Sequence, residues 1–236
     1  MKAFVIEHLE PVLSPWAYLE YEHAARFAPY LLVTNVRDEG ERRCIERFAE
    51  ALRESATEVL EGCSTVVLDP RAPQLLSHRD VEECDYVVVG GIMGDFPPRG
   101  RTSTLLTNRM EWATARSLGP CQFSVDGAVY VASRVLWGGG LEDVRVVQGV
   151  TVRSDEVEIH LPFCYPLDEE GRVLISEKLV AYMMTLLEEH EMYAAMSGRP
   201  RSIAEYDCEL NLPEVEYSLS YGEPVRLGDL LELYQR

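Results

Sequence analysis

An apolar strand that runs into a glycine turn constrains the fold of this chain more than any other segment. Val87-Val88-Val89 is continuous and β-branched, which is typical of a strand buried on both faces of a parallel sheet. The turn that follows contains Gly90, Gly91 and Gly94, so the backbone can approach a ligand closely. Ligands of open α/β sheets bind at the carboxyl ends of the strands. The segment therefore predicts an α/β fold with a ligand site beside this turn.

A dinucleotide-binding fold is the obvious alternative, and the same segment counts against it. A G-x-G-x-x-G pattern that ends at Gly94 needs glycine at position 89, where the chain has Val89. Pro97 and Pro98 disfavour a helix that begins directly at the turn, and such a helix would hold a pyrophosphate at its N-terminus. We therefore expect a small ligand whose binding does not depend on contacts to a phosphate group.

Strands and helices alternate along the first 140 residues. Strands are predicted at 3–6, 31–33, 65–68, 85–89 and, weakly, 113–115. Helices are predicted at 15–27, 40–54, 102–110 and 125–136, the last one with Ser124 as its N-cap. This order predicts a parallel sheet with helices on both faces. We assign residues 1–140 to one domain.

The remaining residues, 141–236, have a different pattern and are predicted to form a small α+β extension. Two strands at 144–152 and 157–163 have the spacing of a hairpin. A long helix is expected at 177–195, and a short helix at 227–233 within an acidic tail.

Net charge separates the classes of macromolecular partner. Forty acidic residues against 22 basic ones give a net charge of −18, which repels nucleic acid as a whole. A basic protein or peptide is the electrostatically favoured partner, whereas an acidic surface that only aids solubility is the plain alternative.

The cysteines and the apolar runs indicate the cellular compartment in which the protein is expected. Six cysteines are scattered without a C-x-x-C pair, so we expect reduced thiols and neither disulfides nor a metal site. No apolar run approaches the roughly 18 residues of a membrane span, and no secretory signal is recognised. The expected location is cytoplasmic, with no membrane contact.

Three backbone-rich loops each follow a predicted strand. They cover residues 68–71, 90–94 and 117–123, and the last leads into the capped apolar helix. One glycine turn alone is a weak signal, but three in this order form a more specific pattern.

With these loops the chain resembles the SPOUT superfamily of S-adenosylmethionine-dependent methyltransferases, and most closely the SPOUT-type protein arginine methyltransferases of eukaryotes. The resemblance covers about residues 1–175 and weakens after Glu177. It is carried by the segments 6–10, 68–72, 85–86, 90–95, 97–99, 101–102, 118–119, 126–128, 161–163 and 167–171.

The resemblance implies a deep trefoil knot in the C-terminal part of the α/β domain and S-adenosylmethionine as cofactor. Backbone groups of the three loops would form the cofactor pocket. The residues implied to bind the cofactor are Leu68, Pro70, Gly90, Gly91, Gly94, Leu118, Gly119, Cys121 and Phe123.

The chemistry of arginine methylation indicates which acids to consider. A guanidinium is protonated near neutral pH and must lose a proton as it is methylated, so carboxylates that orient it are needed. Glu7 and Glu10, at the end of the first strand, and Asp95, beside the glycine turn, are the best-placed candidates. For each, a capping or salt-bridge role is the structural alternative.

The function that the resemblance implies, and that the net charge favours, is methylation of an arginine side chain in a basic protein, such as a small-subunit ribosomal protein. Methylation of rRNA or tRNA is the first alternative, and it would need a partner to supply affinity for RNA. The second alternative is a non-catalytic S-adenosylmethionine-binding module of ribosome assembly. Paired acids in the pocket would favour an enzyme over this module.

Overall fold

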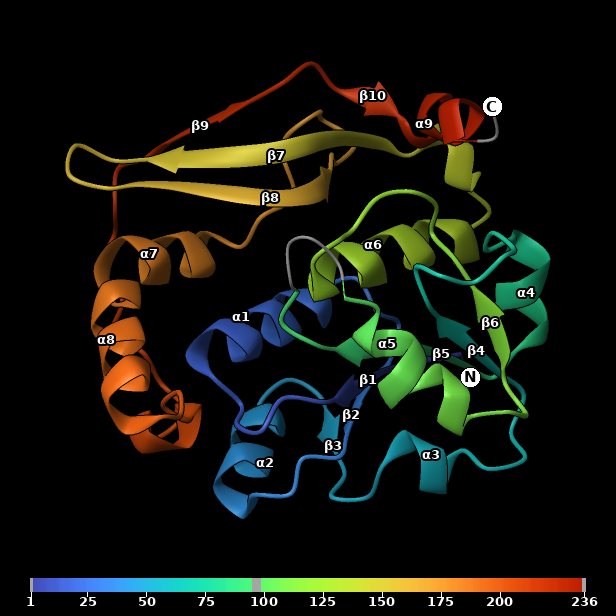
Figure 1. Ribbon diagram of the computed structural model, residues 1–236, viewed down its shortest axis with the longest axis horizontal. Helices are drawn as coiled ribbons and strands as arrows, with labels where there is room; N and C mark the ends of the chain where they lie inside the picture. The colour runs from blue at the N-terminus through green and yellow to red at the C-terminus, as the bar shows by residue number, and fades with distance from the viewer. Residues whose placement is uncertain (1, 95–98, 235–236) are drawn as a thin grey trace.

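The computed structural model describes residues 2–94 and 99–234. Asp95, Pro97 and Pro98 lie outside the described residues. A parallel sheet forms the centre of the α/β part (Figure 1), with the strand order β3-β2-β1-β5-β4-β6. These strands are β1 (Ala3–His8), β2 (Leu31–Thr34), β3 (Glu50–Ala51), β4 (Thr65–Leu68), β5 (Tyr86–Gly91) and β6 (Thr114–Arg116).

The register of the sheet brings the ends of its central strands together. Val89 of β5 pairs with Ile6 of β1 on one side and with Leu68 of β4 on the other. The segments that follow β4 and β5 therefore leave the same edge of the sheet side by side, as the sequence predicted.

Helices cover both faces of this sheet. The side chains of α1 (Pro15–Ala24), α2 (Glu39–Ile45), α4 (His78–Glu83) and α6 (Val125–Leu136) pack with Phe4 and Ile6 in the larger core. The smaller core, on the other face, contains Val5 together with residues of α3 (Ala56–Val59) and of the segment from α5 (Arg101–Leu105) to the 3-10 turn η1 (Thr107–Arg109). Ser14 and Ser124 cap α1 and α6 as expected, since the side chain of each accepts from a backbone N–H of the first turn.

A second, antiparallel sheet lies over α1 and α6 (Figure 1). It contains β7 (Arg145–Arg153), β8 (Glu158–Pro166), β9 (Ser218–Tyr221) and β10 (Val225–Arg226), and β7 pairs with the other three. The helices α7 (Glu177–Thr185) and α8 (Leu187–Ser197) lie beside it, and α9 (Leu227–Tyr234) follows β10. Two further 3-10 turns are η2 (Leu141–Asp143) and η3 (Ile203–Tyr206). The predicted hairpin and the short last helix are both confirmed.

Three predicted helices are shorter or interrupted in the structure. The helix expected at 40–54 ends at Ile45, and the chain then extends to pair Ala51 with Val33 of β2. The helix expected at 102–110 is the short α5 followed by η1. The helix expected at 177–195 is broken at Leu186, which separates α7 from α8. In each case tertiary packing overrides a helical pattern that local sequence supports.

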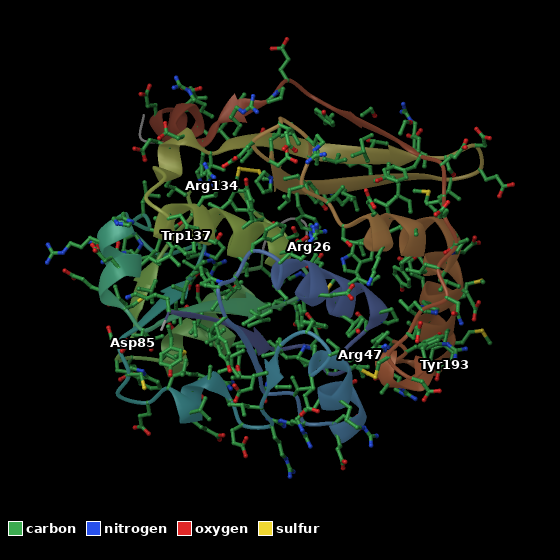
Figure 2. The ribbon with its side chains drawn as sticks, turned by 180° about the vertical axis from the view of Figure 1, so that it is seen from behind. Arg26, Arg47, Asp85, Arg134, Trp137 and Tyr193 are labelled. Carbon is green, nitrogen blue, oxygen red and sulfur yellow. A yellow bond between two sulfur atoms is a disulfide. The ribbon has the colours of Figure 1, made fainter. Side chains whose placement is uncertain are left out.

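The prediction of reduced thiols is wrong for four of the six cysteines. Cys44 of α2 is bonded to Cys208 in the tail, and Cys121 is bonded to Cys164 of β8. Arg47 donates to the carbonyl oxygen of Cys208 at 2.5 Å where α2 meets the tail (Figure 2). Sequence spacing gave no sign of these pairs, because 164 and 43 residues separate their partners and only the fold brings them together.

Alkylation under denaturing conditions tests this pairing. Without reductant we expect iodoacetamide to label two cysteines, Cys63 and Cys84, which are the free thiols. After reduction all six should be labelled, as measured by intact mass and peptide mapping. Six labelled cysteines before reduction would restore the sequence-based expectation.

Candidate functional site

A pocket of about 340 Å³ opens at the carboxyl edge of the parallel sheet, where the three predicted loops meet. Eight of the nine residues proposed to bind a cofactor line it. These are Leu68, Pro70, Gly90, Gly94, Leu118, Gly119, Cys121 and Phe123. Residues 99–102 close another side, and Val125 and Ala128 of α6 add apolar surface. The volume lies in the range of roughly 300–1,000 Å³ that is common for small-molecule sites.

Gly119 has the backbone conformation that most clearly requires glycine. Its φ is +97°, and an added Cβ would lie 3.0 Å from Cδ2 of Leu231 in α9. Its backbone N–H donates to Oγ of Ser117 at 3.0 Å. The Ser117 hydroxyl and the last helix thus hold this turn, and Gly119 itself lines the pocket.

Asp69 holds the loop that follows β4. Its carboxylate accepts from the backbone N–H of Arg71 at 2.9 Å and from Oγ1 of Thr107 at 2.7 Å. The side chain is buried. Because both contacts are internal, Asp69 fixes the backbone of Pro70 and Arg71 at the pocket wall.

Gly91 is the one predicted cofactor residue that does not line the pocket. An added Cβ would lie 2.1 Å from Oη of Tyr21 and 2.9 Å from the carbonyl oxygen of Glu7. Glycine is needed here because α1 packs directly on the strand. The sequence-based expectation placed Gly91 at the ligand, whereas in the structure the need for glycine arises from packing.

Glu7 lies outside the pocket, contrary to the sequence-based expectation. Its carboxylate accepts from Oγ of Ser55 at 2.6 Å, from the backbone N–H of Ala56 at 2.8 Å and from Oγ1 of Thr34 at 2.5 Å. The side chain is buried. Side chains alternate along β1, so Glu7 points to the same face as Val5 and toward α3. In this position it holds the first turn of α3.

Glu10 lies against the glycine turn. Its Oε1 accepts from the backbone N–H of Met93 at 2.8 Å and from Nη1 of Arg101 at 3.0 Å. Arg101 also donates to the carbonyl oxygen of Met93. Glu10 and Arg101 together therefore fix the turn on which Gly94 presents its backbone to the pocket. Asp95, the third predicted acid, lies outside the described residues.

A group of buried ionisable residues near the pocket was not predicted. Glu20 of α1 accepts from Nε1 of Trp16 at 2.8 Å and from the backbone N–H of Val125 at 3.2 Å. Burial, and next the nearby Asp126, raise the pKa of Glu20 to about 8. Asp126 in turn lies 2.6 Å from Nδ1 of His23. The one sequence signal was an acid among apolar residues of a helix, which is too common to select a site.

The part of the chain that the structure describes has neither a cluster of metal ligands nor a membrane-spanning helix. Across residues 2–94 and 99–234, no group of three or more His, Cys, Asp or Glu side chains is arranged to hold a metal ion. Within the same ranges, no helix combines the length and apolar character needed to cross a membrane.

Comparison with known proteins gives consistent matches. Residues 3–190 match the model of a family described as protein arginine N-methyltransferase SFM1-like. The curated protein arginine N-methyltransferase SFM1 of Saccharomyces cerevisiae is 29% identical over 195 residues, which covers 75% of this chain and 92% of the relative.

Solved structures agree with this match. The yeast arginine methyltransferase SFM1 in complex with SAM has a TM-score of 0.68 and 26% identity, and the match covers 76% of this chain and 88% of the yeast chain. Its complex with SAH has a TM-score of 0.67 and 26% identity, covering 75% and 92%. The described elements therefore share the arrangement of these ligand-binding chains.

Proposed function

The chain belongs to the SFM1-like family of protein arginine N-methyltransferases, and we propose that it methylates an arginine side chain of a ribosomal or other basic protein. It is an S-adenosylmethionine-dependent methyltransferase, which confirms the resemblance seen in its sequence. The observation that carries the proposal is the pocket in which three strand-exit loops converge.

The pocket fits S-adenosylmethionine, which supplies a methyl group on a positively charged sulfur. Leu68, Leu118 and Phe123 provide apolar walls, and Gly90 and Gly119 have no side chain that would keep a ligand away from the backbone. Arg71 also lines the pocket, and we assign its guanidinium to the carboxylate of the cofactor's methionine portion. Asp69 and Glu10 hold the backbone of two of the loops and are positioning residues in this proposal.

The predicted acids differ in how well their positions suit catalysis. Glu10 supports the glycine turn through Met93 and Arg101, so its proposed effect on the reaction is indirect. The role predicted for Asp95 stays a prediction. Glu7 is satisfied by three donors near α3, and we propose a structural role for it.

Two finer points of architecture belong to the proposal. We infer that the chain after β6 forms the trefoil knot, because Ser117 pairs with the segment after β4 through Gln74 and Leu76 before α6 packs against β5. Mechanical unfolding would then give an extended length shorter than the full chain allows.

We also infer that residues 1–140 form the catalytic domain and that 141–236 are an extension.

The class of substrate follows from charge. A net charge of −18 favours encounter with a basic protein, and this attraction should weaken as salt rises. RNA is the alternative substrate, and a cofactor-binding assembly module is the non-enzymatic alternative.

An assay of methyl transfer to separated ribosomal proteins and to ribosomal RNA distinguishes these functions. The purified protein is incubated with methyl-labelled S-adenosylmethionine and with small-subunit ribosomal proteins or with ribosomal RNA, in separate reactions. We expect label in protease-sensitive, ribonuclease-resistant material. Label only in the RNA reaction would overturn the protein substrate, and no label in either reaction would favour the assembly module.

A further inference from the structure

A second, smaller cavity opens beside the cofactor pocket and shares a wall with it. Its volume is about 200 Å³, and both cavities are lined by Ile92, Gly94, Phe123, Ser124 and Val125. An added Cβ at Gly94 would lie 2.8 Å from Cε1 of Phe163, so the turn and β8 meet closely where the two cavities adjoin. A group in this second cavity therefore lies next to a group in the first.

The lining of the second cavity combines aromatic walls with one acid. Trp16, Phe123 and Phe163 are the aromatic residues, and Glu20 is the one ionisable side chain among its described lining residues. Glu20 is only 6% exposed, and the described groups that shift its pKa include no lysine or arginine. Burial without a cation disfavours the ionised form of this carboxyl group, so a cationic ligand would stabilise that form.

We propose that this cavity binds the substrate arginine, with its guanidinium on the carboxylate of Glu20 and between the aromatic side chains. This inference rests on the proposed function and names the residues that recognise the methylated group. It moves the substrate-binding acid from β1, where the sequence placed it, to α1.

The contacts of Glu20 leave room for such a ligand. A carboxylate has about four acceptor positions, and Trp16 and the backbone of Val125 use two of them. Two remain for a forked, bidentate guanidinium. Planar guanidinium also stacks on aromatic faces, whereas the ammonium of lysine presents no plane. The site therefore favours arginine over lysine.

Glu20 can also accept the proton that the guanidinium loses during methylation. A new N–C bond forms at the guanidinium as the S–C bond of the sulfonium breaks, and the electron pair of that bond stays on sulfur. The attacking nitrogen then carries one proton too many, and the Glu20 carboxylate accepts it. Burial raises the pKa of Glu20 to about 8 when no cation is bound, so at neutral pH the side chain releases a proton as the guanidinium binds and takes one up again as the nitrogen is methylated.

Nuclear magnetic resonance of the Trp16 indole tests this site directly, because its N–H donates to Glu20. The protein is saturated with S-adenosylhomocysteine and titrated with N-acetyl-arginine amide or N-acetyl-lysine amide. We expect the Trp16 resonance, assigned with Trp16→Phe, to shift with the arginine compound and not with the lysine compound. Equal shifts with both, or none with either, would overturn the proposal without any variant of Glu20.

Variants of two acids on α1 sharpen the test. Glu20→Gln should weaken binding of the arginine amide at least about 30-fold. This loss corresponds to about 2 kcal/mol of binding free energy, which is typical when one partner of a buried charge pair is removed. Glu22→Gln is the matched control, since Glu22 pairs with Lys178 at 2.7 Å and does not line the cavity. Unchanged arginine affinity in Glu20→Gln would contradict the assignment.

Calorimetric titration with S-adenosylhomocysteine separates this inference from the proposed function. All variants should bind it like the wild type, which also shows that they fold. If the wild type does not bind it, the proposed function fails. If it binds but Glu20 has no effect on the arginine compound, only the arginine site fails.

Discussion

Gly119→Val should weaken binding of S-adenosylhomocysteine about 10- to 100-fold while the fold persists. The φ of +97° is strained for a β-branched residue, and such strain costs about 1–3 kcal/mol. The turn relieves it by moving, and this displaces the backbone between Leu118 and Cys121 that lines the pocket. Isothermal titration calorimetry measures the affinity, and circular dichroism checks the fold.

Gly222→Val is the matched control for this substitution. An added Cβ at Gly222 meets nothing within 4 Å, and its φ lies outside the left-handed range. It should therefore leave the affinity unchanged. If Gly119→Val also bound S-adenosylhomocysteine normally, the assignment of the third loop to the cofactor would be wrong.

Glu7→Ala should lower the free energy of unfolding by about 3 kcal/mol and leave the affinity for S-adenosylhomocysteine near normal. The substitution removes the acceptor for Ser55, Thr34 and the backbone of Ala56, and buried donors without partners are costly. The carboxylate does not line the cofactor pocket, so binding should persist. Urea denaturation followed by circular dichroism measures the stability.

Glu61→Ala serves as the control, because Glu61 is exposed. It should change stability by less than about 0.5 kcal/mol. A Glu7→Ala variant that is as stable as the wild type but inactive would contradict the structural role and restore Glu7 as a catalytic acid.

The parallel sheet and the three loops were predictable because each depends on local sequence. Apolar β-branched runs mark β4 and β5, and the pattern of glycine and proline marks the turns after them. The cofactor pocket then follows from the rule that parallel strands present their carboxyl ends at one edge. The two-residue strand β3 had no such pattern, since it exists through pairing with β2.

The acids were harder to place because proximity in sequence does not decide which face a side chain takes. Glu7 and Glu10 are three residues apart, yet one supports α3 and the other supports the glycine turn. Glu20 reaches the second cavity only because α1 packs against α6, where the backbone N–H of Val125 donates to its carboxylate. The disulfide Cys121–Cys164 likewise depends on β8 lying beside the third loop.

Amino-acid analysis of the methylated product tests the central claim most directly. Small-subunit ribosomal proteins are incubated with the enzyme and methyl-labelled S-adenosylmethionine, then hydrolysed in acid and separated by mass. The account predicts labelled N-methylarginine, at a level that Glu22→Gln preserves and that Glu20→Gln lowers at least about 30-fold. Label in methyl-lysine or another residue, with arginine unmodified, would contradict it.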